Sequence, residues 1–107
     1  MSSVVEHRIT QADLRNLLRG EGGVDLERVV EAGEQVAMRI VGVQPGTVAA
    51  RLGAHNGDTI ESINDLRLTT VAAAYKAADL AVQQAKIVIK GARDGEPYTT
   101  VLVLETN

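Results

Sequence analysis

The sequence contains no cysteine, tryptophan or phenylalanine, and Tyr75 and Tyr98 are its only large aromatic residues. The lack of cysteine excludes disulfides, thiol catalysis and thiolate metal sites. Because large aromatic side chains are nearly absent, the core must be built from Val, Leu, Ile and Ala, which pack closely between a sheet and a helix. Hydrophobic residues still make up 45% of the chain, which is the composition of a folded globular protein.

Long apolar runs are also missing. No stretch approaches the roughly 18 apolar residues that a membrane-spanning helix needs. The first residues, Met1 to His7, have neither the basic start nor the apolar block of a signal peptide. We therefore expect either a cytosolic protein or a domain taken from a longer exported or membrane-anchored chain.

The chain has no excess of positive charge. Its net charge is −3, and the Lys and Arg residues are spread from Arg8 to Arg93 without a cluster. Binding to nucleic acid requires a basic face that releases phosphate counterions. We therefore expect no nucleic-acid partner.

The 107 residues give room for a single domain, which we place over 1–107. Residues 1–8 are expected to be disordered or tag-like, and residues 9–19 to form a helix that Thr10 caps and Gly20 ends. Apolar runs separated by glycine-rich turns predict the remaining elements. We expect strands over 26–31, 36–43, 59–63, 87–90 and 98–104, and helices over 48–52 and 71–84.

Strands surround the two later helices without alternating strictly with them. This order predicts an α+β fold, in which a small, curled, mostly antiparallel β-sheet is capped by two helices. The helix over 9–19 would be an extra N-terminal element.

The helix over 71–84 is apolar around most of its circumference. At about 100° per residue its polar side chains fall in one narrow sector, which leaves an apolar arc of about 220°, whereas a helix resting on one sheet needs little over 100°. We expect one side of the arc to face the core, and the other edge either to form a groove wall or to extend a wide buried face. The core side comprises Val71, Tyr75, Ala78 and Val82, and the other edge comprises Ala73, Ala77 and Leu80.

The middle of the chain carries an ordered pattern of turn residues and small residues. Residues 44–53 read QPGTVAARLG, and residues 57–64 read GDTIESIN. Gly57 suits a positive φ, and the Asp58 carboxylate can accept local backbone N–H groups. The pattern resembles bacterial PDZ domains, and this resemblance implies a PDZ-like fold.

Two features depart from the usual PDZ pattern. Asp65 stands where the family usually has glycine. The loop over 20–25, GEGGVD, is acidic, whereas PDZ domains that bind a C-terminal carboxylate place an apolar–Gly–apolar motif there. Because Glu21 and Asp25 repel an anion, recognition of a free C-terminus is disfavoured.

The flanking segments indicate a particular family among bacterial PDZ domains. Residues 9–14 (ITQADL), 39–46 (RIVGVQPG) and 93–95 (RDG) are similar to the periplasmic domain of the type II secretion C protein family, over about Ile9 to Leu104. The resemblance implies a periplasmic domain of an inner-membrane protein. It also implies protein partners, namely secretin periplasmic domains, other secretion components or secreted proteins.

The same resemblance implies a non-catalytic interaction domain. A partner segment would add beside the strand over 26–31, and its apolar side chains would enter a groove. Leu26 and Val30 would form the floor, and Arg28 would pair with an acidic partner residue. The predicted partner-binding groove comprises Leu26, Arg28, Val30, Ala73, Ala77 and Leu80.

No catalytic or metal-binding pattern is visible. His7 and His55 lack partners at ligand spacing, and Ser62 has neither an elbow motif nor a His–Asp set. We therefore expect no enzymatic activity, metal, cofactor or small-molecule substrate. The alternative function is a substrate-presenting PDZ domain of a periplasmic protease, whose catalytic residues would lie outside this sequence.

Overall fold

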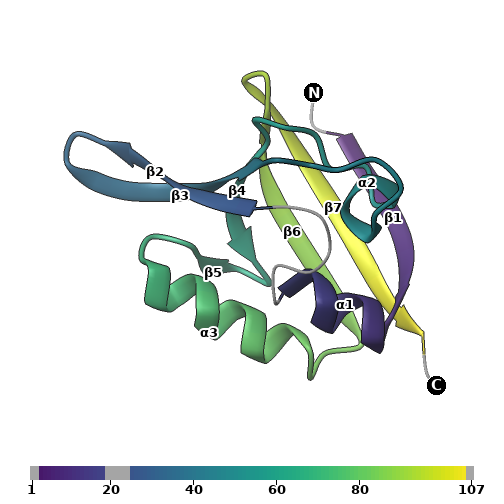
Figure 1. Cartoon of the computed structure of the whole chain (residues 1–107). Coiled ribbons are helices and arrows are strands. Elements are labelled where there is room, and N and C mark those ends of the chain that lie inside the picture. Colours follow the sequence, from purple (N-terminus) through teal and green to yellow (C-terminus); the bar gives the residue numbers. More distant parts are fainter. Residues whose placement is uncertain (1–2, 19–24, 106–107) are drawn as a thin grey trace.

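Seven strands form one open, mostly antiparallel sheet in the computed structural model, which describes residues 3–18 and 25–105 (Figure 1). The strands lie in the order β1-β7-β6-β4-β3-β2, and β5 pairs with β4. The strand bounds are β1 Ser3–Thr10, β2 Asp25–Glu31, β3 Glu34–Val41, β4 Thr59–Ile63, β5 Leu66–Arg67, β6 Lys86–Arg93 and β7 Glu96–Glu105. The helices are α1 Gln11–Leu18, α2 Val48–Arg51 and α3 Val71–Ala81.

The N-terminal segment is a strand, so the expectation that residues 1–8 are disordered or tag-like is wrong from Ser3 onward. β1 pairs in parallel with β7, in a register that runs from Ser3 opposite Tyr98 to Thr10 opposite Glu105. Ile9 belongs to this strand, and its side chain is buried in the core. Helix α1 therefore begins at Gln11, two residues later than expected, and the Thr10 hydroxyl accepts the Asp13 N–H at 3.1 Å.

Threonine hydroxyls cap the other two helices as well. The Thr47 hydroxyl accepts the Ala50 N–H at the start of α2, and the Thr70 hydroxyl accepts the Ala73 N–H at the start of α3. Helix α3 ends at Ala81, three residues before the predicted end. None of the helices in the described part of the chain is long and apolar enough to cross a membrane.

Residues with positive φ form the tight turns. Gly57 has a φ of 93°, which confirms the predicted conformation. Asn64 and Asp65, between β4 and β5, have φ values of 49° and 68°. Asp65 thus adopts the left-handed conformation that a glycine would adopt more easily.

Small and aliphatic side chains form the core in two clusters. The first centres on buried Ile9, Leu14, Ala81, Ile87 and Leu102, and it packs α1 and the end of α3 against the sheet. The second centres on Met38, Leu68 and Ala77 and fixes the middle of α3. Val82 packs against the first cluster, as predicted for a core-facing residue.

Candidate partner-binding groove

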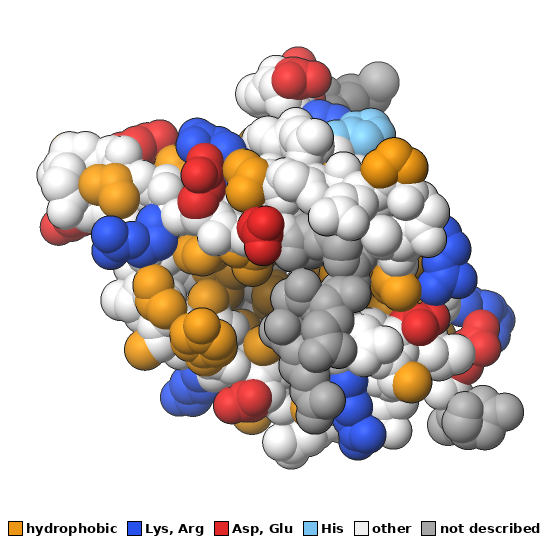
Figure 2. All heavy atoms as spheres, in the orientation of Figure 1, with side chains coloured by type: hydrophobic (Ala, Val, Ile, Leu, Met, Phe, Trp, Pro, Cys, Tyr) orange, Lys and Arg blue, Asp and Glu red, His pale blue; other side chains and the backbone are white. Residues whose placement is uncertain are grey.

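An open, apolar groove lies between β2 and α3. Figure 2 shows hydrophobic side chains gathered in the hollow between the β2–β3 hairpin and α3. The cavity that includes this groove has a volume of about 870 Å³. Its lining includes Leu26 and Arg28 from β2, Met38 and Ile40 from β3, and Val71, Ala74, Tyr75 and Ala78 from α3.

Strand β2 forms one wall of the groove and one edge of the sheet. It pairs only with β3, and the opposite edge of its backbone has no partner strand among the described residues. Leu26 lies opposite Ile40 and Arg28 opposite Met38. Because directly opposed residues project to the same face of a sheet, Leu26 and Arg28 share the face of Met38 and Ile40, which line the cavity.

Helix α3 forms the other wall, but it is rotated relative to the prediction. Tyr75 was expected in the core, yet its side chain is 69% exposed and lies at the groove. Ala77 was expected on the groove wall, yet it is 2% exposed and packs in the second core cluster. The physical reason is size: α3 lies against the sheet, where an alanine fits and a tyrosine does not.

The remaining predicted site residues lie apart from the groove lining. Leu80 is 45% exposed and lines a smaller cavity with Ala77, Ile63 and Asn64. Val30 is an exposed residue near the end of β2, and Ala73 is half-buried on α3. Of the six predicted groove residues, Leu26 and Arg28 line the groove, while Val30, Ala73, Ala77 and Leu80 do not.

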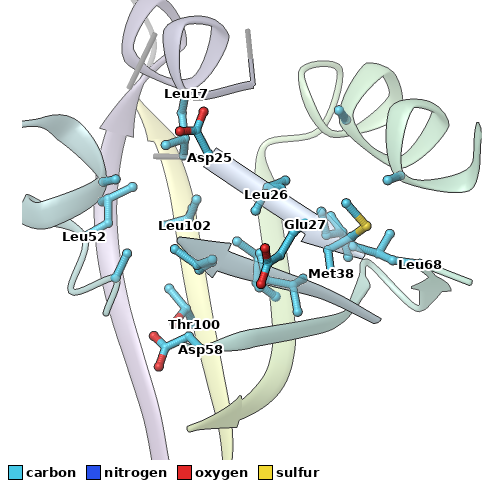
Figure 3. A pocket seen from close by; sticks show the side chains of 18 of the residues that line it. Leu17, Asp25, Leu26, Glu27, Met38, Leu52, Asp58, Leu68, Thr100 and Leu102 are labelled. Carbon is cyan, nitrogen blue, oxygen red and sulfur yellow. The ribbon is translucent and has the colours of Figure 1, made fainter. Parts of the chain in front are cut away.

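The cavity extends from the groove toward the strands on the far side of the core. Figure 3 shows Leu26, Met38 and Leu68 near one end, and Thr100 and Leu102 from β7 farther along the wall. Leu52 also lines this part. Such a depth accommodates long apolar groups as well as the side chains of an extended segment.

An ion pair between a buried aspartate and a partly exposed arginine lies among the cavity lining, and sequence reasoning missed it. Asp58 is 2% exposed, and its two carboxylate oxygens accept Arg93 Nε at 2.8 Å and Arg93 Nη2 at 2.7 Å. Asp58 also accepts the His55 N–H at 3.0 Å, which agrees with its predicted role in the turn. Arg93 Nη2 donates in addition to the Gly53 carbonyl at 2.8 Å. The pair thus joins the loop after α2 to β6.

Tyr98 extends this network. Its hydroxyl donates to the Thr59 carbonyl at 2.8 Å, and the Arg93 guanidinium lies 5.6 Å from its ring centre. Burial, and then the Asp58 carboxylate, raise the pKa of Tyr98 to about 12, although Arg93 acts in the opposite direction. The hydrogen bond to Asp58 raises the pKa of Arg93, so its guanidinium stays charged. Asp58, Arg93 and Tyr98 are thus all engaged in contacts that hold parts of the fold together.

The titratable groups do not assemble a metal site in the described part of the chain. His7 lies in β1, and His55 lies in the loop after α2. The acidic loop that was expected to disfavour carboxylate recognition falls mostly on residues 20–24, which lie outside the described residues. Asp25, the last residue of that segment, lines the cavity.

No family model matches the chain, and no curated protein matches it. The fold is nevertheless shared with solved structures. The PDZ domain of EpsC from Vibrio cholerae, residues 204–305, superposes with a TM-score of 0.67 at 18% identity, over 87% of this chain and 89% of that one. A shorter form, residues 219–305, gives a TM-score of 0.59 at 17% identity, over 77% and 94%.

A third similar structure is the PDZ domain of the pullulanase C protein of the type II secretion system from Klebsiella pneumoniae, in complex with fatty acid. It superposes with a TM-score of 0.62 at 16% identity, over 84% of this chain and 90% of that one. The chain therefore has the fold of a PDZ domain, as the sequence predicted. The similar structures are PDZ domains of type II secretion proteins, and PDZ domains are in general binding domains.

Proposed function

We propose that the chain is a non-catalytic protein-interaction domain of the type II secretion machinery, and that it binds an extended partner segment in the groove between β2 and α3. The observation that carries the proposal is an unpaired edge strand beside an open apolar groove in the described part of the chain. A strand added to such an edge forms hydrogen bonds with its free backbone N–H and C=O groups. Pockets beside the edge then select the side chains of the added segment.

We base the proposed location and partner class on the similarity of the fold to PDZ domains of type II secretion proteins. The type II secretion origin of the similar PDZ domains supports a periplasmic domain, carried by a parent protein in the inner membrane. It also supports partners within the secretion machinery, with the periplasmic domains of the secretin as the first candidates. A membrane helix encoded upstream in the parent gene would support this assignment, whereas an upstream protease domain would favour the substrate-presenting alternative.

Calorimetric titration with purified secretin periplasmic domains tests the proposal. Ala78 is half-buried on the groove side of α3, and Ala72 is exposed on the same helix outside the groove lining. Ala78→Arg places a long charged side chain in the groove and should weaken binding at least tenfold. Ala72→Arg adds the same charge to the same helix and should leave binding unchanged.

Two results would contradict the proposal in different ways. Equal binding by both variants would show that the partner uses another surface. No binding by the unmodified domain would exclude the secretin domains as the partner. Thermal melting of both variants establishes that each remains folded.

A second candidate function is the binding of a fatty acyl chain. The similar pullulanase C domain was solved in complex with fatty acid. The cavity here is lined mainly by apolar side chains, and its volume of about 870 Å³ is within the usual range for small-molecule sites. Native mass spectrometry with a saturated C16 fatty acid should give a one-to-one complex for the unmodified domain and none for Ala78→Arg. Absence of the complex in both would exclude this function.

A further inference from the structure

Arg28 is the cation among the β2 side chains that line the cavity, whose lining also includes the acidic residues Asp25 and Glu27. It is exposed, lines the groove, and lies opposite Met38 in the strand register. Leu26, two residues earlier, lies on the same face and is likewise exposed. A partner strand added to β2 would therefore meet an apolar residue and a cation in succession along one face.

Arg28 forms no ion pair within the described residues. Three other arginines have carboxylate partners: Arg39 with Glu27 at 3.3 Å, Arg51 with Asp13 at 2.9 Å, and Arg93 with Asp58 at 2.7 Å. Arg28 has no such contact among the residues that the structure describes. Its neighbour Glu27, which also lines the cavity, is paired with Arg39.

We propose that Arg28 makes the groove select a partner segment with an acidic side chain two residues from an apolar one. The inference rests on the proposed function, because it assumes that the segment adds to β2 as a strand. The apolar side chain would lie beside Leu26, and the acidic side chain beside Arg28. The partner is thus an internal extended segment with the pattern apolar–any–acidic, or the same pattern reversed if the strand runs the other way.

The spacing follows from strand geometry. Alternate residues of a strand project to the same face, so the partner residues facing Leu26 and Arg28 must also be two apart. Directly opposed side chains of paired strands have Cβ atoms about 5 Å apart, within reach of a guanidinium and a carboxylate. The planar guanidinium can donate two parallel hydrogen bonds to one carboxylate, which an amide or hydroxyl partner cannot match.

Because Arg28 is exposed, its ion pair with the partner's acidic side chain should affect which segments are selected more strongly than it affects the total binding affinity. Exposed pairs contribute modestly, so loss of the charge should weaken binding by about two- to fivefold, and reversal of the charge by about tenfold. Differences of this size are amplified over successive rounds of selection. Selection from a library of displayed segments is therefore the appropriate measurement.

The experiment uses the full chain and a library of random twelve-residue segments displayed between fixed flanks, so that no free terminus is offered. Three proteins are immobilised: the unmodified domain, Arg28→Glu and Arg67→Glu. Arg67 is exposed on β5 outside the groove lining, so Arg67→Glu makes the same change in net charge away from the site. Arg28→Gln is included because it removes the charge without reversing it.

The unmodified domain and Arg67→Glu should both enrich segments with the predicted pattern. Arg28→Glu should enrich Lys or Arg at the position where the others enrich Asp or Glu, and Arg28→Gln should show no preference for charge there. If Arg28→Glu enriches the same segments as the unmodified domain, Arg28 does not select the partner.

Failure of the proposed function would look different. In that case the unmodified domain enriches nothing, or the enriched segments bind Ala78→Arg as tightly as the unmodified domain. If instead Ala78→Arg abolishes binding while Arg28→Glu leaves the selected pattern unchanged, the groove is the binding site and only the role of Arg28 is wrong.

Discussion

Gly91 shows how one missing side chain permits a close approach of two strands. Its position in β6 lies opposite Ile60 of β4 and Tyr98 of β7. A Cβ atom there would lie 1.8 Å from the Thr59 carbonyl oxygen and 3.0 Å from the Tyr98 hydroxyl. Because a backbone atom blocks the space, an alanine can be accommodated only if β4 moves.

Gly91→Ala should therefore lower the free energy of unfolding by more than about 2 kcal/mol. Gly95→Ala is the matched control, since Gly95 has a φ of 80° but a Cβ atom added to it would meet no other atom within 4 Å. Its cost should be limited to backbone strain of about 1 kcal/mol. Denaturant unfolding measures both, and an equal or smaller loss for Gly91→Ala would contradict the close packing of β4 on β6.

Asp65 offers the opposite test, because a glycine should fit better than the residue present. Asp65→Gly should raise the free energy of unfolding by about 0.5 kcal/mol, since it relieves the φ of 68°. Asn64→Gly, one residue earlier, should lower it, because the Asn64 side chain accepts the Val88 N–H at 2.7 Å. Thermal melting of the two variants should shift in opposite directions, and a lower melting temperature for Asp65→Gly would contradict the turn conformation.

The raised pKa of Tyr98 predicts a loss of stability at alkaline pH. Its pKa is about 12 in the folded chain and about 10 when unfolded, so the unfolded state loses the proton first as pH rises. The contribution of this pKa difference to the free energy of unfolding is fully present below about pH 10 and is lost between about pH 10 and 12. It amounts to up to roughly 2–3 kcal/mol, at about 1.4 kcal/mol per pKa unit.

The tyrosine titration can be observed directly in a Tyr75→Phe variant, in which Tyr98 is the only tyrosine. Ultraviolet absorbance of the tyrosinate should rise with a midpoint near pH 12 while the protein remains folded. Denaturant unfolding of the same variant at pH 9 and pH 11.5 should show the loss of stability. A midpoint near pH 10 in the folded protein would contradict the burial and hydrogen bonding of Tyr98.

The sequence of helix α3 predicts where the helix begins but not which of its faces packs against the sheet. The start and the threonine cap were predictable because they depend on residues within four positions of each other. The orientation was not, because six alanines within the eleven residues make several faces almost equally apolar. The close approach of the helix to the sheet determines the orientation, and it brings Ala77 rather than Tyr75 into the core.

The orientation of α3 makes a pair of lysine substitutions informative. Ala77→Lys should lower the free energy of unfolding by more than about 3 kcal/mol, because it forces a charged side chain into a buried site. Tyr75→Lys should change it by less than about 1 kcal/mol, because the site is largely exposed. Denaturant unfolding distinguishes the two, and the reverse order of stabilities would mean that α3 is rotated as the sequence analysis expected.

Strand β1 marks a second limit of sequence reasoning. Its partner, β7, lies more than 90 residues away in the chain, so local patterns do not reveal the parallel pairing of Ser3 with Tyr98. The segment also exposes Val4 and Val5, which weakens the alternation that usually marks a half-buried strand. The central turns, by contrast, were predictable because glycine, asparagine and proline act within a few residues.

The sheet as a whole offers two edges, and only one of them lies beside the groove. The β1 edge is at one end of the strand order, and the β2 edge at the other, facing α3 (Figure 1). The groove lining, the exposed Tyr75 and the unpaired backbone of β2 coincide there in the described part of the chain. The proposed partner surface is therefore the one formed by β2 and α3, and the β1 edge is its natural comparison.

Mapping of backbone amide NMR shifts, on addition of a segment enriched by the unmodified domain, distinguishes the two edges. Binding in the groove should shift the amides of β2 (residues 25–31) and of the groove side of α3 (Val71, Tyr75 and Ala78) most strongly. The amides of β1 and its neighbour β7 should change little, and Ala78→Arg should abolish the shifts. Shifts that centre on β1, or that persist in Ala78→Arg, would contradict a partner site between β2 and α3.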